Sequence, residues 1–455
     1  MDPKIFSIYD IRGIYPDQWD KKDAFLLGQA FGTFFQRNNV NTVFLGRDNR
    51  LSSPVINQEV CKGLLKTGCQ VIDLGTIIVP MIYFSWRHFD ANATLMVTAS
   101  HNPPQYNGLK SSIRKKVIFA DQLQKIKEIA LKKDFLKGTG KKEKKDIVAP
   151  YIQSLKEKVD LQKPLKIIID TGNGTAGIFT AKIFKNAGCQ VTSLFAEPDG
   201  SFPNHQPYPQ KSELYQELKN QLQNGQYNLG LAFDGDGDRI GVYNTNGNFI
   251  ENDIIAAIFA KDICQKHPGA KIVLNVSATL AVLETIKKYG GQPILWHTGY
   301  PFITKKMKEI DAIFGGEISG HFFFRDRHFG FDDAIYSALR LLEIIASGKS
   351  LNQLIADIPH YYQIPEFRIP VPQNIDKYQL AQKIGQDIEK SHPEAKILNI
   401  DGTRFSFEDS WGLIRHSNTE PLLSGRAEGK TKKGLDKIRN IINQKFEKFG
   451  IKEKI

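Results

Sequence analysis

Three aspartates alternate with glycines in the segment 233–239, which reads Phe-Asp-Gly-Asp-Gly-Asp-Arg. The apolar run 229–233 predicts a strand that ends at this segment, and a second apolar run follows it directly. Glycines allow the backbone to turn tightly, so Asp234, Asp236 and Asp238 can converge on one hard cation. Without a cation the three carboxylates would repel one another. We therefore predict a magnesium site here, completed by an oxygen of a phosphate group.

Two other interpretations of this aspartate loop were weighed. A calcium-binding EF-hand starts with similar residues, but it needs glycine at loop position 6 and glutamate at position 12. Those positions hold Arg239 and Thr245, which argues against an EF-hand. An Asp-Gly repeat can also form a plain surface turn, and the loop by itself leaves this structural alternative open.

Ser100 lies in the segment 98–104, Thr-Ala-Ser-His-Asn-Pro-Pro, directly after the predicted strand 94–97. The carboxyl end of a strand is where α/β sheets bind their ligands, so this serine is a candidate nucleophile. The segment lacks the GxSxG pattern of a hydrolase. Neighbours in sequence rarely point at each other, so adjacency alone does not pair Ser100 with His101. Lys110 follows in the segment 106–110 and places a cation in the same region. The alternative is that the segment 98–104 forms a purely structural turn.

Two further loops combine hydrogen-bonding groups on an irregular backbone. The first, 315–321, reads Gly-Gly-Glu-Ile-Ser-Gly-His and suits sugar hydroxyls, which need fixed donors and acceptors. The second, 415–421, reads Arg-His-Ser-Asn-Thr-Glu-Pro and favours an anion, because arginine binds phosphate bidentately and free N–H groups add donors. Each loop has a structural alternative: a turn before a helix for the first, and a helix N-cap for the second.

The elements that position these loops repeat one theme three times. An apolar strand at 42–45, 166–170 or 272–275 leads into a small polar turn, a helical stretch and a second strand that follows a glycine. This order is typical of right-handed βαβ units, so we predict three related α/β domains.

We predict four domains, at residues 1–147, 148–248, 249–364 and 365–455. The Lys- and Gly-rich stretch 136–147 reads as a solvated linker between the first two. The proline-spaced segment 364–372 reads as an extended linker, because each proline disfavours helix at itself and before itself. Beyond it lies a smaller α+β domain with strands expected at 405–407 and 411–414. The successive domains carry the serine loop, the aspartate loop, and the loops 315–321 and 415–421.

Composition excludes several classes of function. The 455 residues are 41% hydrophobic and 24% charged, as in ordinary globular proteins. The net charge is +12, but the densest basic run is only 141–145, so we expect no nucleic-acid binding. Positive charge around a cleft can instead raise the local concentration of small anionic substrates. No run approaches the roughly 18 apolar residues of a membrane span. Four scattered cysteines and no secretory signal predict a cytoplasmic protein.

The four loops, in this order, resemble the α-D-phosphohexomutase superfamily, and the similarity runs from Tyr9-Asp10-Ile11-Arg12-Gly13 to the loop 415–421. The loops 316–321 and 417–419, with the segment 329–334, look like its phosphomannomutase/phosphoglucomutase branch. The resemblance implies a heart-shaped, four-domain α/β enzyme, with three related α/β domains and a C-terminal α+β domain, whose loops meet in one central cleft.

The resemblance also implies roles for particular residues. The catalytic group comprises Ser100, as a phosphoserine, with Lys110, Arg12 and His101. The ligands of one Mg²⁺ per chain are Ser100, Asp234, Asp236 and Asp238. Substrate binding falls to Arg239, Glu317, Ser319, His321, Arg415, Ser417, Asn418 and Thr419. The expected partner is a small sugar phosphate, with a hexose 1,6-bisphosphate as activator and intermediate. No binding to nucleic acid or to a membrane is expected. The expected oligomeric state is a monomer or a weak homodimer.

Three departures from the family pattern concern the sugar. His297 and Tyr300 stand in the loop 296–301 where a basic residue and a histidine are usual, Ser277 replaces a lysine, and Tyr208 replaces Asp or Asn. Phosphoglucosamine mutase, a mutase for glucose phosphate alone and a non-catalytic sugar-phosphate-binding paralogue therefore stay as alternatives. We expect a fourth domain that moves after the proline-spaced segment and retains the bisphosphate while it turns over.

Overall fold

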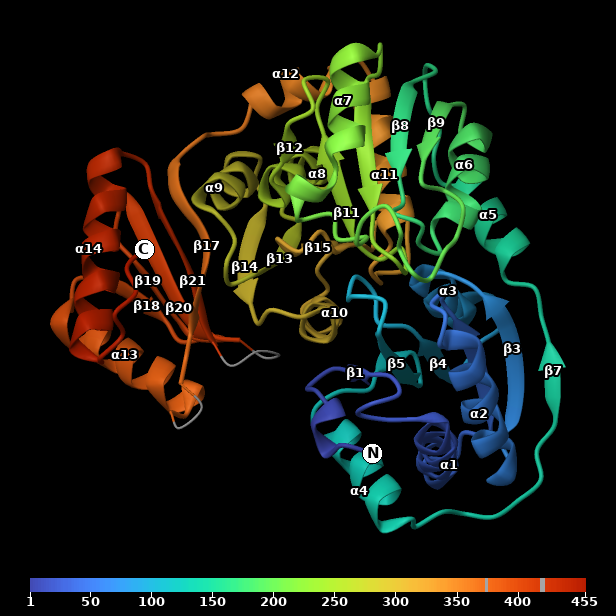
Figure 1. Ribbon diagram of the computed structural model, residues 1–455. Coiled ribbons are helices and arrows are strands. Elements are labelled where there is room, and N and C mark those ends of the chain that lie inside the picture. The colour runs from blue at the N-terminus through green and yellow to red at the C-terminus, as the bar shows by residue number, and fades with distance from the viewer. Residues whose placement is uncertain (373–374, 418–421) are drawn as a thin grey trace. The chain divides into compact units, whose positions relative to one another are not determined.

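The computed structural model describes all 455 residues except 373–374 and 418–421. The chain divides into two compact units: unit 1 comprises residues 1–255 and 319–354, and unit 2 comprises residues 256–318 and 355–455. Figure 1 labels their elements. Helices α8 (Asn252–Lys266) and α12 (Leu351–Ala356) cross a boundary between the units.

Unit 1 contains two mixed sheets. The first has the order β1 (Ile11–Ile14), β5 (Tyr106–Ile113), β4 (Ala93–Val97), β2 (Thr42–Arg47), β3 (Gln70–Thr76) and β7 (Lys142–Lys144), with β6 (Lys116–Val117) beside β5. Its helices are α1 (Lys21–Arg37), α2 (Ser53–Lys66), α3 (Val79–His88) and α4 (Asp121–Lys132). Helix α1 begins with a capping box built by Asp20 and Asp23 and packs on α2 over a core of buried aliphatic and aromatic side chains.

The second sheet of unit 1 has the order β12 (Phe249–Ile250), β11 (Ile240–Tyr243), β10 (Leu229–Phe233), β8 (Lys166–Asp170) and β9 (Gln190–Leu194). Helices α5 (Val148–Lys156), α6 (Gly177–Asn186) and α7 (Gln216–Asn224) accompany it. Unit 1 also contains β16 (Phe322–Phe324) and α11 (Ala334–Ala346), and single 3-10 turns at Pro3–Ile5 and Ser212–Leu214.

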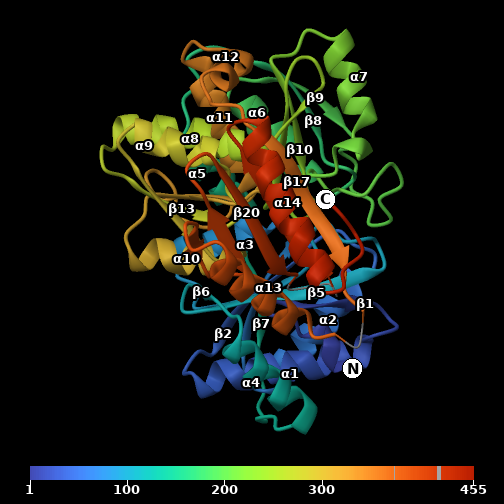
Figure 2. The same ribbon diagram turned by 90° about the vertical axis from the view of Figure 1, so that its left-hand side faces the viewer.

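Unit 2 contains β13 (Lys271–Asn275) between the parallel strands β14 (Gln292–Trp296) and β15 (Phe314–Gly316), with α9 (Leu280–Lys288) and α10 (Tyr300–Glu309). Its antiparallel sheet has the order β17 (Tyr362–Pro370), β21 (Leu422–Gly429), β20 (Ser410–His416), β19 (Thr403–Ser406) and β18 (Lys396–Leu398). Helices α13 (Lys377–Ser391) and α14 (Lys432–Lys448) pack on this sheet, as Figure 2 shows.

Three parallel strand trios share one topology. Each has the order third-first-second along the chain: β4-β2-β3, β10-β8-β9 and β15-β13-β14. This repetition confirms the prediction of three related α/β domains followed by an α+β domain. Because parallel strands end at one edge of their sheet, the loops after β4, β10 and β15 occupy equivalent positions in the three trios.

Both predicted linkers form paired strands. Residues 142–144 add β7 to the edge of the first sheet, parallel to β3. The proline-spaced segment forms most of β17, which pairs with β21 and changes register between Ile364 and Phe367. Pro365 falls at that irregularity on an edge strand, where a missing N–H costs no ladder bond. The predicted solvated linker is exposed and paired at a sheet edge, and the predicted extended linker is an edge strand, so pairing satisfies backbone groups at both places.

Candidate active site

The serine loop lies between β4 and β5, at the carboxyl end of β4. Ser100 is only 2% exposed and has φ of +51°, a left-handed conformation that is uncommon for a residue with a side chain. Its Oγ donates to Oδ2 of Asp234 at 2.7 Å and lies 3.1 Å from Nδ1 of His101. The expectation that the two neighbours do not meet was therefore wrong, because the turn places both side chains on the same side.

Arg50 holds the serine loop in this conformation. Its guanidinium donates to four carbonyl oxygens of the loop: those of Ser100 at 2.7 Å, Asn102 at 2.6 Å, Pro103 at 2.8 Å and Tyr106 at 3.1 Å. Asp48 pairs with its Nε at 3.2 Å, and both side chains are buried. Arg50 is not among the site residues predicted from the sequence. The signal that could have found it is its position just after β2, which is parallel to β4 in the same sheet.

The aspartate loop lies between β10 and β11, also in unit 1. Asp234, Asp236 and Asp238 are fully buried, and each offers a carboxylate oxygen within 4.8 Å of the others. The backbone N–H groups of Asp238 and Arg239 donate to Oδ1 of Asp234 at 3.0 and 3.1 Å, which fixes the turn. A Cβ on Gly235 would stand 2.6 Å from the carbonyl oxygen of Ser100, so glycine is needed where the two loops touch.

One cation pairs with these carboxylates, and a second contacts the serine loop. Nζ of Lys110 is 2.9 Å from Oδ2 of Asp236 and also contacts Asp238. Arg12 donates to Asn102 at 2.6 Å and pairs with Asp10 at 2.5 Å. Burial, together with the two neighbouring aspartates, raises the pKa of Asp234 well above its ordinary range.

A divalent cation fits this donor set. Oδ1 of Asp236 and Oδ1 of Asp238 are buried without a hydrogen-bond partner, and three carboxylates in one fold of backbone are the hard oxygen ligands that Mg²⁺ and Ca²⁺ prefer. The metal-ligating group predicted from the sequence is thus brought together, with the Ser100 hydroxyl beside it.

The loop around Gly320 contacts the aspartate loop within unit 1. The carbonyl oxygen of Gly320 accepts from the N–H of Ile240 at 3.2 Å. Nδ1 of His321 is 2.8 Å from Oγ of Ser319, and its Nε2 is 3.3 Å from Oδ1 of Asp238. Ser319 and His321 therefore lie beside the aspartate loop, and Arg239 is half-buried at the end of that loop.

In unit 2, Glu317 and Arg415 are connected through a chain of hydrogen bonds. Oε1 of Glu317 accepts from the N–H of Gly299 at 2.6 Å, and Thr298 donates its N–H to Asp401 at 3.1 Å. Asp401 in turn pairs with Arg415 at 2.9 Å. The altered loop 296–301 is thus bonded at both sides to predicted substrate-binding residues. The sequence analysis missed Asp401, whose only local signal is the Asp-Gly turn before β19.

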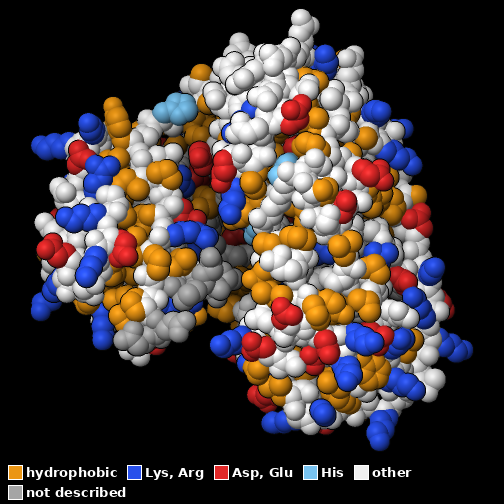
Figure 3. Space-filling view, viewed as in Figure 1, with side chains coloured by type: hydrophobic (Ala, Val, Ile, Leu, Met, Phe, Trp, Pro, Cys, Tyr) orange, Lys and Arg blue, Asp and Glu red, His pale blue; other side chains and the backbone are white. Residues whose placement is uncertain are grey.

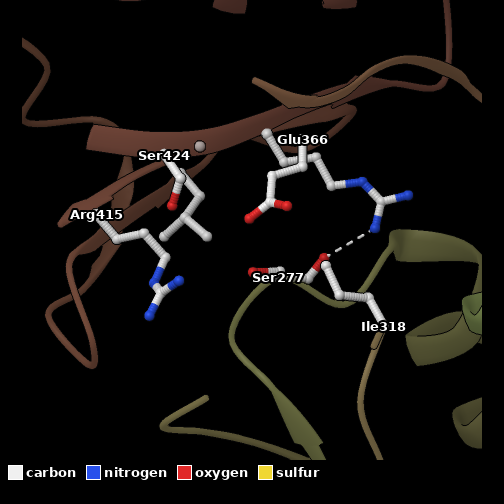
Figure 4. Close-up of a pocket in the computed structure, with 8 residues that line it drawn as sticks. Ser277, Ile318, Glu366, Arg415 and Ser424 are labelled. Atoms are coloured by element: carbon white, nitrogen blue, oxygen red, sulfur yellow. Dashed lines mark hydrogen bonds between the residues drawn. The ribbon is translucent and has the colours of Figure 1, made fainter. Parts of the chain in front are cut away.

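A pocket in unit 2 lies beside Arg415, as Figure 4 shows. Ser277, Ile318, Glu366 and Ser424 line it, and the Glu366 carboxylate points into it. Oγ of Ser424 and Nε of Arg415 are buried without a hydrogen-bond partner. These groups offer further donors and an acceptor close to the predicted phosphate-binding loop. Ser417 donates its N–H to Leu422 at 2.9 Å, whereas Asn418 and Thr419 lie outside the described residues.

Known proteins resemble this chain along its whole length. Sequence models of phosphoglucomutase/phosphomannomutase match in order: alpha/beta/alpha domain I at 3–137, domain II at 149–247, domain III at 251–362 and the C-terminal domain at 366–445. A phosphomannomutase/phosphoglucomutase of Pseudomonas aeruginosa is 37% identical over 97% of this chain and 95% of its own.

The chain belongs to the phosphoglucomutase/phosphomannomutase family.

Two further relatives agree with that assignment. A phosphoglucomutase of Neisseria gonorrhoeae is 37% identical, covering 96% of this chain and 95% of its own. The crystal structure of a phosphoglucomutase/phosphomannomutase family protein from Burkholderia thailandensis gives a TM-score of 0.93 at 33% identity, covering 99% of this chain and 98% of that one. Membership confirms the superfamily resemblance, the four-domain α/β architecture and the prediction of an intramolecular phosphotransferase. The domain boundaries and the individual residue roles stay predictions.

Proposed function

We propose that this phosphoglucomutase/phosphomannomutase family member interconverts hexose 6-phosphate and hexose 1-phosphate, with mannose, glucose or both as the sugar. The observation that carries the proposal is the Ser100 hydroxyl, which bonds to Asp234 within the buried aspartate group and beside Lys110. A serine nucleophile, a metal-binding carboxylate group and cations are the parts that phosphoryl transfer needs.

The residues of unit 1 support a reaction through a phosphoserine. Phospho-Ser100 donates its phosphoryl group to the free hydroxyl of the substrate, so the bond from phosphorus to Oγ breaks and one to the sugar oxygen forms. Burial lowers the pKa of His101 well below its usual value, as do Arg239 and Arg12. The imidazole is therefore neutral, and it takes the hydroxyl proton and returns it to the departing Oγ. The product of this half-reaction is a hexose 1,6-bisphosphate.

Charge neutralisation is the main task of the surrounding groups. Asp234, Asp236 and Asp238 would hold Mg²⁺, which would supply positive charge against the phosphoryl oxygens. Lys110 and Arg12 act at the same group, because phosphoserine adds nearly two negative charges to a buried site. In the structure Lys110 pairs with two of the aspartates, so its ammonium would compete with a bound cation for them.

The residues of unit 2 would bind the remainder of the sugar phosphate in the same cycle. We propose that Glu317 accepts from sugar hydroxyls and that Arg415 and Ser417, with Asn418 and Thr419, bind the phosphate that does not react. The bisphosphate then turns over, so that its other phosphate is returned to Ser100. Either end of the substrate must therefore suit the arginine loop.

The decisive experiment follows the phosphate. Peptide mass spectrometry of the protein after incubation with a hexose 1,6-bisphosphate should find phosphate on Ser100, and Ser100→Ala should abolish mutase activity. Ser201→Ala, which changes an exposed serine of unit 1, is the matched control and should stay active. An unphosphorylated Ser100 together with an active Ser100→Ala variant would disprove the mechanism.

The sugar requires a separate test. Ser277, His297 and Tyr300 differ from the residues usual in the family, so a panel of mannose, glucose and glucosamine phosphates with Mg²⁺ and a trace of bisphosphate is needed. We expect the first two to be the better substrates. If glucosamine 6-phosphate is clearly best, the alternative of a phosphoglucosamine mutase replaces this proposal.

Other classes of function have less support. On the face shown in Figure 3, acidic and basic side chains are mixed on both units, whereas nucleic-acid binders concentrate their cations. Among the described residues, no helix is long and apolar enough to span a membrane. The four cysteines are buried thiols. A cytoplasmic location and a monomeric or weakly dimeric state are further parts of the proposal.

A further inference from the structure

Asp332 is a buried carboxylate with no assigned task. It follows the segment Phe329-Gly330-Phe331 and is only 1% exposed, yet neither of its carboxylate oxygens has a hydrogen-bond partner. A carboxylate removed from water without hydrogen bonds is costly unless a proton or a cation compensates it. Its ionisable neighbours are Asp238, His321 and Lys110, which are also buried.

The three side chains converge on one point. Nε2 of His321 is 3.3 Å from Oδ1 of Asp238 and 3.9 Å from Oδ2 of Asp332, and all three ligand atoms lie within 4.8 Å of one another. In a tetrahedral zinc site with bonds of about 2.0–2.1 Å, the ligand atoms are about 3.3–3.4 Å apart. Small rotations of the side chains would bring the three atoms to that spacing.

The surroundings orient the imidazole for such a bond. Nδ1 of His321 lies 2.8 Å from Oγ of Ser319, a contact that holds the ring and allows Nδ1 to keep its proton. Without a bound cation Nε2 keeps a proton towards Asp238, and a cation would take its place, since a histidine binds metal only as the neutral imidazole. Histidines that bind metals generally have their other ring nitrogen engaged in this way. Both oxygens of Asp332 lack a hydrogen-bond partner, so this carboxylate is the unsatisfied group that a cation beside His321 and Asp238 would compensate.

We propose that Asp238, His321 and Asp332 form a second cation site, which takes a borderline transition metal such as Zn²⁺ and thereby withdraws His321 from the sugar phosphate. One nitrogen and two carboxylates favour Zn²⁺ over Mg²⁺, whereas the all-oxygen aspartate group suits Mg²⁺. Asp238 belongs to both groups, so the inference rests on the aspartate loop as a metal site. It does not require mutase turnover. The expected consequence is inhibition by Zn²⁺ in competition with substrate.

Counting bound zinc tests the proposal without any activity. Equilibrium dialysis of the wild-type protein, free of substrate and Mg²⁺, should find two Zn²⁺ per chain. Asp332→Asn and His321→Gln should each retain one, with affinity for the second reduced at least ten- to a hundredfold. Asp234→Asn should instead lose the Zn²⁺ of the aspartate group and keep the other. Asp17→Asn, which changes an exposed aspartate, should still bind two.

Co²⁺ absorption supplies a second readout. A cation with a histidine ligand and few oxygens absorbs visible light more strongly than one in an octahedral oxygen site, so the wild-type and Asp234→Asn proteins should show the band and Asp332→Asn should not. Mg²⁺ binding by Asp332→Asn establishes that the variant is folded. One Zn²⁺ per wild-type chain, or two in Asp332→Asn, would overturn the inference. Loss of activity in Ser100→Ala is independent of these counts, so the two proposals fail separately.

Discussion

At the scale of single residues, the site combines groups that are unfavourable in isolation. Ser100 adopts a left-handed backbone conformation, and the three aspartates are fully buried side by side. Each is compensated by a particular neighbour: Arg50 binds the carbonyl of Ser100, and Lys110 pairs with Asp236 and Asp238. Strained backbone and buried charge of this kind are typical of functional sites. They persist because the packing of the surrounding structure holds them in place.

Lys110→Met should separate charge stabilisation from metal binding. Loss of an ammonium beside the reacting phosphoryl group is expected to lower kcat by about 10²–10³-fold, as for other preorganised charges. Mg²⁺ affinity should be unchanged or tighter, because Lys110 no longer competes for Asp236 and Asp238. Steady-state kinetics and calorimetric Mg²⁺ titration check the two parts. The matched control is Lys182→Met in α6, and a loss of Mg²⁺ binding by Lys110→Met would contradict the assignment.

Lys158 gives a prediction about pH. Its Nζ donates to Ser154 at 2.8 Å, is 3.2 Å from Nδ1 of His328 and lies over the ring of Phe329. Burial lowers its pKa from 10.5 to about 8, against the attraction of Asp333. The pKa is lower in the folded state, so the unfavourable contribution of Lys158 to stability is complete below pH 8 and diminishes as the pH rises towards 10.5.

Chemical labelling measures this directly. An amine-reactive reagent, followed by peptide mass spectrometry, should label Lys158 with a pH midpoint near 8, since only the neutral amine reacts. Lys116, which is exposed on β6, should respond as an ordinary lysine at higher pH. The same late midpoint for both lysines would refute the lowered pKa of Lys158.

At the scale of elements, the serine loop depends on a residue from another strand end. Arg50 follows β2 and binds four carbonyls of the loop between β4 and β5. Strands β2 and β4 are parallel neighbours, so their carboxyl ends are adjacent by construction. The planar guanidinium can reach several acceptors at once, whereas a lysine ammonium is a single point charge.

Arg50→Lys should therefore impair the loop although the charge is retained. One ammonium cannot replace the bonds to Ser100, Asn102, Pro103 and Tyr106, and buried carbonyls left unpaired cost about 1–3 kcal/mol each. We expect kcat to fall and Ser100 to be phosphorylated more slowly, with Mg²⁺ affinity near that of the wild type. Arg114→Lys, on an exposed turn of unit 1, is the control. Wild-type phosphorylation of Arg50→Lys would show that the loop holds its shape without the guanidinium.

At the scale of the whole molecule, the two compact units do not coincide with the four domains. Unit 2 joins the C-terminal sheet to the segment 276–280 through buried groups. Arg404 donates to the carbonyls of Val276 and Ala278 at 2.6 and 2.7 Å, and Glu428 accepts from the N–H of Leu280 at 2.9 Å. Any motion of the sheet against this segment must break these bonds. The bonds would therefore restrain the expected movement of the fourth domain.

Arg404→Leu should loosen this connection. It leaves two buried carbonyls without the guanidinium and removes its stacking over Trp411, at 3.5 Å. We expect a loss of about 1–3 kcal/mol in local stability and faster hydrogen exchange in 276–280. Arg439→Leu on the exposed face of α14 should change stability by about 0.5 kcal/mol or less. Unchanged exchange in 276–280 would mean that other contacts maintain the connection.

The sequence by itself determined the repeated α/β plan and the chemistry of the loops. Strand periodicity and glycine-bounded turns are local properties, so the three parallel trios could be predicted from them. The alternation of Asp234, Asp236 and Asp238 with glycines likewise predicted the group of converging carboxylates that the structure contains. The pairing of the two linkers was not predicted, because whether an extended segment pairs depends on a partner far away in the sequence.

Only the tertiary structure decided which side chains meet. The contact of Ser100 with Asp234 spans 134 residues and that of Lys110 with Asp236 spans 126. The local signals at Arg50, Asp401 and Asp332 are a strand end, an Asp-Gly turn and a short motif, and none of them names the partners of these side chains. Their importance arises from burial and from partners that chain folding supplies. Residue types and spacing thus specify which chemistry is possible, while packing specifies which groups are close enough to perform it.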